Sequence, residues 1–480
     1  GGPYTVAGDV SMDGGGLITL SGENAHRLFR VQPGASLRLA NLILADGSAV
    51  EGAGSILNEG TLVLDTVTIR NSKTTGVNSG GGAITNLAGT LTIFGSQLVN
   101  NEAAYTGGAL SLNDGITVIE NSVIDGNMAQ TFGAIDSTGD LTIRNSTIRG
   151  NRSHFGDGGG IGVIKGTATI EESLIEENFA AAGGGGLYVS PNYPGTAVVV
   201  RDTRILDNEA DVTFAGSLGG GLYNGANVTL ERVTVDGNRA YNAGGLFQYG
   251  NKGLLTVRDS TVSNNSAVHV AGGLQLSGAL GHFFTNVTIS GNAAADWAGG
   301  LYVVDYPAAL QNVTLFGNRA PIGANLYNVR TTLTFTSTIL GNPQDGGANC
   351  EAEGSAQPVI SGGYNIDSDA TCNLAGVGDQ SVADPQLGPL VDNGGSTLTH
   401  APLSGSPAID AAAAACTNTD QRGYLRPAGV GCDAGAVEAS AVAPAPSVVR
   451  PLPPLQPVAA NYLWQGNLNL PVIQYPLPKV

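Results

Sequence analysis

Short runs in which apolar and polar residues alternate recur along the chain, and Gly, Asn and Asp separate them. Residues 91–93, 141–143 and 255–257 are examples, each with a Thr between two aliphatic residues. A period of two in segments rich in β-branched residues is typical of half-buried strands. The pattern therefore predicts a chain built from many short β-strands.

A second pattern is a phrase in which an aliphatic residue is followed three positions later by Asn. It occurs ten times with an average spacing of about 27 residues, which lies in the range of solenoid repeats. The residue before the Asn is Gly, Asn or Asp in nine copies, and Glu177 is the exception. Because Gly, Asn and Asp tolerate a left-handed backbone, each copy is expected to end a strand at a tight corner.

The Asn of each phrase is a candidate for either structure or sugar binding. We favour an internal ladder, in which each amide bonds the equivalent Asn of the next coil, because buried polar groups are normally paired. The predicted ladder residues are Asn101, Asn127, Asn151, Asn178, Asn208, Asn238, Asn265, Asn292, Asn318 and Asn342.

Short strands, Gly corners and the regular period together predict an all-β fold, a right-handed single-stranded parallel β-helix (solenoid). Each repeat forms one coil that rises about 4.8 Å along the axis. Coils are expected over residues 1–345, followed by a disulfide-containing C-terminal β-helix/cap segment over 346–440, a Pro-rich linker over 441–458 and an apolar strand-like tail over 459–480. The tail residues expected to drive assembly are Tyr462, Leu463, Trp464, Leu468, Leu470, Val472, Ile473 and Tyr475.

Composition narrows the function classes. The chain has 72 Gly among 480 residues, only 12% charged residues and a net charge of −18. The charged fraction is too low for a coiled coil, and 42% hydrophobic residues are too many for a disordered chain. Collagen is excluded because the Gly residues have no period of three. The negative balance argues against nucleic acid and anionic membrane surfaces as partners. The shortage of charge is expected from the fold, since like charges stacked one coil apart would repel each other.

Two groups of motifs resemble known families. The aliphatic-x-x-Asn phrase and the Gly-Gly-Ala-Ile phrase at 81–84 resemble the repeats of polymorphic outer-membrane protein adhesins, although the usual Phe before the Asn is here Ile, Leu or Val. The segment from Asn349-Cys350 through Ser-Pro-Ala-Ile-Asp at 406–410 to Cys-Asp-Ala-Gly-Ala-Val-Glu at 432–438 is similar to choice-of-anchor Q type bacterial surface proteins. This resemblance implies export, a β-helix body and a C-terminal sorting segment.

The four cysteines all lie in the C-terminal segment. Two local disulfides, Cys350 with Cys372 and Cys416 with Cys432, fit their spacing best. They indicate an oxidising compartment, hence a secreted or cell-surface location. No stretch of the sequence has the length of a transmembrane helix.

Aromatic residues recur between the corner Asn and the following glycines in eight consecutive coils. We favour a row of rings stacked inside the turn, and the alternative is a platform for glycan rings or a protein partner. The residues of this predicted column are Tyr105, Phe132, Phe155, Phe179, Phe214, Tyr241, His269 and Trp297.

Charged residues cluster in the C-terminal segment, where a network is expected to close the end of the solenoid. No cofactor is expected, and Ca²⁺ bound by surplus carboxylates is the alternative. The predicted network comprises Asp410, Asp420, Arg422, Arg426, Asp433 and Glu438.

The sequence predicts a non-catalytic extracellular structural protein. It would be a rigid rod that acts as a surface adhesin, or as the subunit of a filament assembled head-to-tail through its tail. The alternative is a polysaccharide lyase or glycoside hydrolase acting on acidic polysaccharide, which needs a cluster of carboxylates or an Asp-bound Ca²⁺ with an Arg base. The best local group for such a site is Asp136, Asp140, Arg149, His154 and Asp157.

Overall fold

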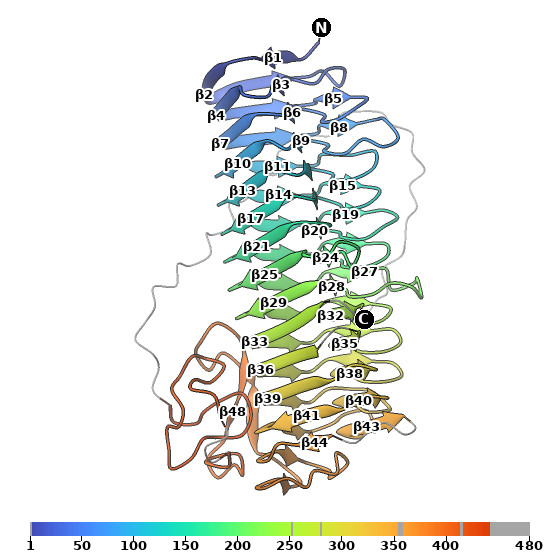
Figure 1. Cartoon of the computed structure of the whole chain (residues 1–480), viewed down its shortest axis with the longest axis vertical. Coiled ribbons are helices and arrows are strands. Elements are labelled where there is room, and N and C mark those ends of the chain that lie inside the picture. Colours follow the sequence, from blue (N-terminus) through green and yellow to red (C-terminus); the bar gives the residue numbers. More distant parts are fainter. Residues whose placement is uncertain (1, 251–252, 279–280, 354–358, 413–415, 442–480) are drawn as a thin grey trace, which may run out of the picture.

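The computed structural model describes residues 2–250, 253–278, 281–353, 359–412 and 416–441. The chain winds as a right-handed parallel β-helix of about 13 turns, so that each coil lies directly below the previous one (Figure 1). No helix in the described ranges is long and apolar enough to cross a bilayer. The predicted linker and apolar tail lie outside the described residues, except for Ala441.

One face of the solenoid, face A, is a parallel sheet with one strand from each coil. From β9 to β38 its strands begin at the aliphatic residue of the glycine phrase, and all its strands pair in succession along the axis. The strands are β1 (Tyr4–Val6), β3 (Phe29–Val31), β6 (Ile56–Asn58), β9 (Ile84–Leu87), β12 (Leu110–Asn113), β16 (Ile135–Ser137), β20 (Ile161–Val163), β24 (Leu187–Val189), β28 (Leu222–Asn224), β32 (Leu246–Tyr249), β35 (Leu274–Ser277), β38 (Leu301–Val304), β40 (Leu326–Val329) and β43 (Cys350–Glu353).

The second face, face B, is bent, and its two halves carry the alternating segment and the aliphatic-x-x-Asn phrase. In some coils a single strand runs through the bend: β2 (Asp9–Ser21), β4 (Ser36–Ala45), β7 (Thr61–Arg70), β33 (Leu254–Ser263), β36 (Gly281–Ser290) and β39 (Ala308–Phe316). In the others it is split: β10 (Thr90–Phe94) and β11 (Gln97–Val99), β13 (Ile116–Glu120) and β14 (Val123–Asp125), β17 (Asp140–Arg144) and β18 (Thr147–Arg149), β21 (Thr167–Glu171) and β22 (Leu174–Glu176), β25 (Ala197–Arg201) and β26 (Arg204–Leu206), β29 (Asn227–Glu231) and β30 (Thr234–Asp236), β41 (Leu333–Thr336) and β42 (Ile339–Gly341), β44 (Ile360–Ser361) and β45 (Ile366–Asp367).

A short third face, face C, follows the corner Asn and leads into the turn before face A. Its strands are β5 (Ser48–Ala49), β8 (Lys73–Thr74), β15 (Met128–Ala129), β19 (Arg152–Ser153), β23 (Phe179–Ala180), β27 (Glu209–Ala210), β31 (Arg239–Ala240), β34 (Ser266–Ala267) and β37 (Ala293–Ala294). The chain ends its last coil at β46 (Gln380–Ser381), which pairs with β45.

The core is one continuous stack of aliphatic side chains inside the coils. Ile124, Ile148 and Ile175, which lie three residues before the corner Asn, are fully buried and are neighbours in successive coils. Burying one such side chain contributes about 1.5–3 kcal/mol, so the stack is the main stabilising term. The left-handed corner is present as expected, with positive φ at Gly126 and even at Glu177.

The corner Asn residues form a ladder from Asn101 to Asn318. In each step the side-chain Nδ2 donates to Oδ1 of the next Asn at 2.9–3.0 Å, and the same Oδ1 also accepts the backbone N–H of the preceding Asn. Each Nδ2 also donates to a carbonyl one coil earlier, such as Asn127 to Leu98 at 2.9 Å. The ladder thereby satisfies buried polar groups that would otherwise lack partners.

The prediction for Asn342 is wrong. The ladder continues from Asn318 through Asn325 and Asn349 to Asp367, with side-chain distances of 2.7 Å at each step. Asn342 itself occupies the left-handed corner, with φ of 48°, and its side chain is exposed. Strand pairing aligns Gly341 with Phe316, so Asn342 takes the corner position of Gly317, one position before the ladder residue Asn318.

The C-terminal segment differs from the predicted cap. Residues 346–381 complete the last coil, but residues 382–441 turn back and lie along the side of the rod, next to β33, β36 and β39 (Figure 1). This part contains an antiparallel hairpin of β47 (Leu387–Val391) and β48 (Thr399–Pro402). Side chains rather than strand pairing attach it: Gln421 Nε2 donates to Thr261 Oγ1 at 2.8 Å, and Thr288 Oγ1 donates to Gln421 Oε1 at 2.7 Å.

Candidate functional site

The outward side chains of face A form a column that runs along the rod. Each strand contributes the residue that follows its first buried aliphatic position, and the strand register places these residues directly one below another, about 4.8 Å apart. The column reads Thr85, Ser111, Asp136, Gly162, Tyr188, Tyr223, Phe247, Gln275, Tyr302, Tyr327 and Glu351.

Aromatic rings in this column contact each other across coils. The ring centroids of Tyr188 and Tyr223 are 4.8 Å apart, and those of Tyr223 and Phe247 are 5.3 Å apart. Phe132 continues the row from the preceding turn, with its centroid 5.8 Å from Tyr188. Its ring lies over Gly162, where any Cβ would overlap it, so glycine is required at that position.

A second run of rings crosses from the turn onto face A. Tyr241 contacts His269 at 5.7 Å, His269 contacts Trp297 at 5.5 Å, and Trp297 stacks on Tyr327 at 6.0 Å. Tyr302 stacks on Tyr327 at 5.7 Å. We call these five half-buried residues the aromatic strip.

Hydrogen bonds fix the His269 ring within the aromatic strip. Its Nδ1 is 2.9 Å from Asn242 Oδ1, and its Nε2 is 3.4 Å from Asp296 Oδ2. Tilted ring contacts with Tyr241 and Trp297 hold the ring from both sides as well, so the strip presents its rings at fixed positions.

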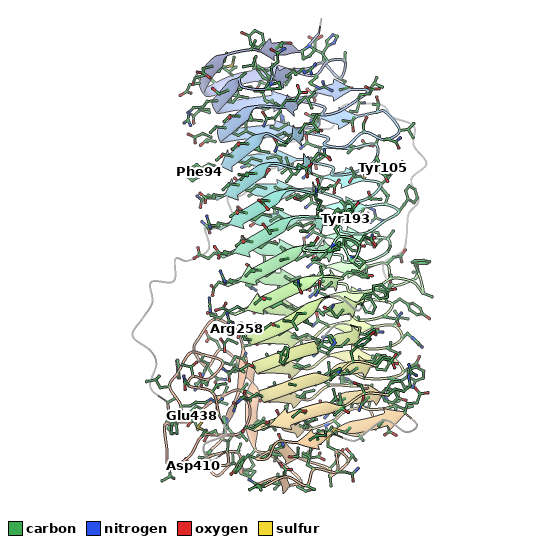
Figure 2. All side chains as sticks on the ribbon, in the orientation of Figure 1. Phe94, Tyr105, Tyr193, Arg258, Asp410 and Glu438 are labelled. Atoms are coloured by element: carbon green, nitrogen blue, oxygen red, sulfur yellow. A yellow bond between two sulfur atoms is a disulfide. The ribbon has the colours of Figure 1, made fainter. Side chains whose placement is uncertain are left out.

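The predicted column of eight rings does not form as one unit. Among these eight residues, ring contacts join only Tyr241, His269 and Trp297. Tyr105, Phe155 and Phe214 are 43%, 78% and 53% exposed, and Phe179 lies in β23 with the Arg152 guanidinium 3.8 Å from its ring centroid. Figure 2 shows Tyr105 at the edge formed by the turns. Successive coils range from 24 to 30 residues in length, so a ring at a similar sequence offset occupies a different corner.

The column on face A was missed by the sequence analysis. A usable signal exists, because an aromatic residue directly follows the aliphatic residue of the glycine phrase at Tyr188, Tyr223, Phe247, Tyr302 and Tyr327. The alternation rule places such a residue on the outer surface of the strand.

The carboxylates proposed for catalysis do not form one site. Asp140 accepts hydrogen bonds from Thr167, Arg149 pairs with Asp125 at 2.9 Å on face B, and His154 Nε2 lies 2.7 Å from Met128 Sδ. Of the five residues in the predicted group, only Asp136 and Asp157 lie near the rings of face A, at the N-terminal end of the row of rings.

Burial raises the pKa of both Asp136 and Asp157 to about 6. In Asp136 a hydrogen bond from Thr106 Oγ1 at 2.8 Å opposes this effect, and in Asp157 a backbone hydrogen bond from Gly183 opposes it. Asp157 also raises the pKa of Tyr188, after burial, so it lies close to that ring. Asp136 is only 8% exposed, which restricts its access to a substrate.

The C-terminal charge network forms, but it stabilises the side segment rather than the end of the rod. Arg422 Nη2 donates to Asp420 Oδ2 at 2.7 Å and to the Glu438 carbonyl at 2.6 Å. Arg426 Nη1 lies 3.2 Å from Glu438 Oε2. Asp433 Oδ1 accepts the backbone N–H of Asp410 at 2.7 Å. Burial raises the pKa of Asp433 to about 6.

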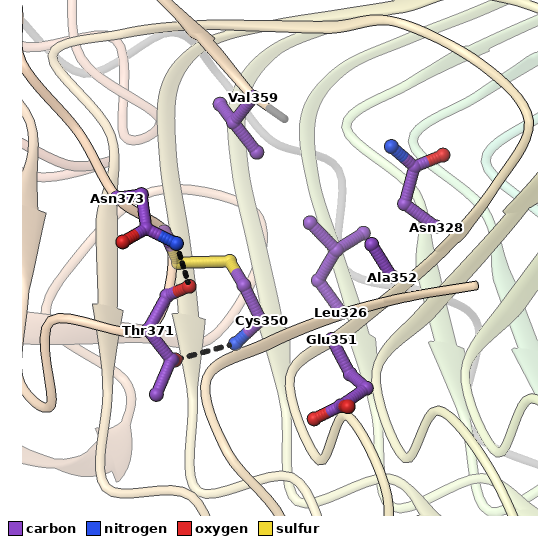
Figure 3. Close-up of a pocket in the computed structure, with 9 residues that line it drawn as sticks. Leu326, Asn328, Cys350, Glu351, Ala352, Val359, Thr371 and Asn373 are labelled. Carbon is purple, nitrogen blue, oxygen red and sulfur yellow. Dashed lines mark hydrogen bonds between the residues drawn. A yellow bond between two sulfur atoms is a disulfide. The ribbon is translucent and has the colours of Figure 1, made fainter. Parts of the chain in front are cut away.

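The two predicted disulfides are confirmed, as Cys350 pairs with Cys372 and Cys416 with Cys432. The first lines an open groove of about 390 Å³ at the last coils, together with Leu326, Glu351 and Val359 (Figure 3). Within the described ranges, no three or more His, Cys, Asp or Glu residues are grouped so that they could hold a metal ion.

Comparison with known proteins supports the fold and leaves the activity open. A family model described as right handed beta helix region matches residues 134–320. No curated protein and no solved structure gives a significant match. The chain is thus a β-helix repeat protein. The family match ends before the C-terminal segment, so the resemblance to choice-of-anchor Q and polymorphic outer-membrane proteins stays a prediction.

Charged side chains on face B are stacked with alternating sign. Along one outward column the order is Glu120, Arg144, Glu171, Arg201, Glu231 and Arg258. Each neighbouring pair forms a salt bridge of 2.8–3.3 Å. Figure 2 shows Arg258 at the edge opposite Tyr105. Unlike charges one coil apart attract, so this column contributes to the stacking instead of opposing it.

We expect Glu231→Gln to lower stability by about 1 kcal/mol at pH 7, because the salt bridges to Arg201, Arg232 and Arg258 are lost. Burial opposes ionisation of Glu231, but hydrogen bonds from Arg258 and Arg232 outweigh it and lower its pKa from 4.5 to about 2. The stabilisation is therefore complete above pH 4.5 and is lost as the pH falls towards 2.

The measurement is the denaturant midpoint of both proteins between pH 2 and pH 7. The variant should show a smaller decline below pH 4.5 than the parent. Glu102→Gln is the matched control, because Glu102 is exposed and forms no salt bridge with a described residue. Equal pH profiles for the parent and Glu231→Gln would contradict the stabilising role of the column.

Proposed function

We propose that this chain is a non-catalytic extracellular structural protein, a rigid β-helix rod that acts as a surface adhesin through its aromatic strip. The observation that carries the proposal is the strip itself. Tyr241, His269, Trp297, Tyr327 and Tyr302 expose part of their rings on one side of a scaffold whose core is continuous. Binding sites with fixed aromatic anchors lose little conformational entropy on binding.

Two disulfides support the extracellular part of the proposal. Disulfides persist in oxidising environments such as secretion compartments and cell surfaces. Cys350–Cys372 joins the last strand of face A to the following loop, and Cys416–Cys432 closes a loop of the side segment. Both therefore stabilise the part of the chain that has few strand pairs of its own.

The ligand class that fits the strip best is a neutral glycan. Sugar rings present apolar faces that stack on aromatic side chains, and successive rings in the strip are 5.5–6.0 Å apart. The net charge of −18 repels a polyanion, which makes an acidic polysaccharide a poorer candidate.

The same rod also suits a filament subunit. In the described residues β1 pairs only with β3, and the filament proposal has a strand from a neighbouring molecule add to the other edge of β1. The predicted apolar tail at 459–480 would supply that strand by β-augmentation, and head-to-tail addition gives fibres.

Deleting residues 443–480 is expected to abolish polymers and to leave folded monomers. Negative-stain electron microscopy and circular dichroism of both proteins test this expectation. Polymers that persist in the deletion variant would rule out the tail as the connecting element.

An enzyme acting on polysaccharide is the second candidate function. The supporting observation is that burial raises the pKa of both Asp136 and Asp157 to about 6 beside the face A rings, and shifted carboxyl groups are common in catalytic sites. The low exposure of Asp136 and the separation of Asp140, Arg149 and His154 favour the non-catalytic proposal.

Trp297→Ala is expected to weaken binding to a neutral glycan about tenfold, because it removes the ring at the centre of the aromatic strip. Glycan-array screening of the intact chain, followed by calorimetry with the best ligand, measures the effect. Phe155→Ala is the matched control, since Phe155 is an exposed ring outside the strip.

Two results would count against the adhesin proposal. One is equal glycan binding by the Trp297 and Phe155 variants. The other is release of reducing ends or unsaturated uronate from the bound glycan, with loss of that release in Asp157→Asn, which would support the enzyme instead.

A further inference from the structure

The aromatic strip ends at two carboxylates. Glu351 lies in the same outward column as Tyr327, one coil further along, and Glu353 follows two residues later. After burial, Glu353 and Glu351 are the groups that raise the pKa of Tyr327, so both lie close to its ring. Both are exposed, and neither forms a salt bridge with a described residue. A ligand that covers the strip can therefore gain an ion pair at this end.

Rings followed by a negative charge are the features that bind proline-rich segments. Such segments adopt the polyproline II helix, which leaves its backbone free and packs proline rings on aromatic side chains at low entropic cost. A basic residue at one end fits the carboxylates and fixes the direction of binding.

This chain contains such a segment itself. Residues 450–457 read Arg-Pro-Leu-Pro-Pro-Leu-Gln-Pro. Arg450 precedes prolines at every third position, Pro451, Pro454 and Pro457, and every third residue of a polyproline II helix lies on the same side. As a polyproline II helix, the segment would have an apolar side with one positive charge at its beginning.

The spacing of the segment matches that of the coils. Three residues of polyproline II span about 9.3 Å, and two coils span about 9.6 Å. Prolines on one side of the segment would therefore meet every second coil. The eight residues cover about 22 Å, and the four coils from Glu351 past Tyr327 and Tyr302 to Phe247 span about 19 Å, so the segment is long enough to follow the column over this distance.

The side segment, which precedes the Pro-rich segment in the chain, lies beside the coils that are nearest the aromatic strip. The side segment contacts the coils nearest the strip, since Gly435 N donates to the Ser337 carbonyl at 2.7 Å and Ala436 N to Thr314 Oγ1 at 3.0 Å. Nine residues, 442–450, then lead to Arg450 and reach at most about 31 Å when extended. For comparison, the last coil passes from the end of β42 at Gly341 to the start of β43 at Cys350, from face B to face A, in nine residues.

We propose that the Pro-rich segment 450–457 docks on the aromatic strip of its own chain. Arg450 lies at Glu351 and Glu353, Pro451 at Tyr327 and Pro454 two coils further along at His269, and the residues between these prolines cover Tyr302 and Trp297. The docked segment covers the rings and fixes where the tail at 459–480 begins along the rod. Docking uses the same rings as the proposed glycan site, so a glycan that binds the strip has to displace segment 450–457.

The test uses Trp297 as a reporter in the full chain. The protein has two Trp residues, so Trp464→Phe leaves Trp297 as the one fluorophore of that type. In this background, replacing Pro451 and Pro454 with Ser is expected to shift Trp297 emission to longer wavelength and to increase its quenching by acrylamide. Replacing Pro476 and Pro478 with Ser is the matched control and should leave both quantities unchanged.

The ion pair is tested by exchanging its charges. Arg450→Glu and Glu351→Lys should each increase quenching of Trp297, and the two together should restore the value of the parent. Circular dichroism of every variant verifies that the coils are intact.

Three outcomes would overturn the proposal. The first is equal quenching in the two proline variants. The second is protection of Trp297 that is lost on dilution, which would assign the strip to a segment of another copy. The third is quenching that responds to added glycan but to no change in residues 450–457, which would leave the strip as a glycan site alone.

Discussion

Stacking of equivalent positions in register is the constraint on which the whole molecule depends. Within the stacked coils, the neighbours of each side chain are the side chains at the same position of the preceding and the following coil, about 4.8 Å away. The corner Asn ladder enforces this register, because an amide such as Asn178 can bond its neighbours Asn151 and Asn208 only when the coils are aligned. A shift by one residue would also turn the aliphatic stack outwards.

The same constraint decides which side chains each column can hold. Inside the coils, Ile124, Ile148 and Ile175 stack as aliphatic neighbours. On face B, charge is tolerated where the sign alternates, as between Glu171 and Arg201. On the outer side of face A, rings stack on rings. The low charge content thus follows from stacking, and the charges that do occur in columns are arranged to attract.

The repeat pattern predicted the fold and the corner ladder up to Asn318, and the spacing of the four cysteines predicted both disulfides. Asn127 and its equivalents follow a phrase that is nearly constant, so their positions could be aligned by eye. The strip was predicted only in part, because Tyr241, His269 and Trp297 lie in a turn of variable length while their partners Tyr302 and Tyr327 lie on a strand. The lateral position of the C-terminal segment depends on contacts such as Gln421 with Thr261, which are 160 residues apart and leave no local pattern.

The measurement that tests this account most directly compares Asn208→Ala with Asn342→Gly. Asn208 is buried within the ladder, and Asn342 ends the same phrase but is exposed. The account predicts that Asn208→Ala lowers the free energy of unfolding by about 1–3 kcal/mol, because the bonds to Asn178 and Asn238 are lost. Asn342→Gly should change it by less than about 0.5 kcal/mol, because Gly tolerates the left-handed backbone at this position and no ladder bond is lost. Equal effects of the two substitutions in denaturant titrations would contradict the central role of the ladder.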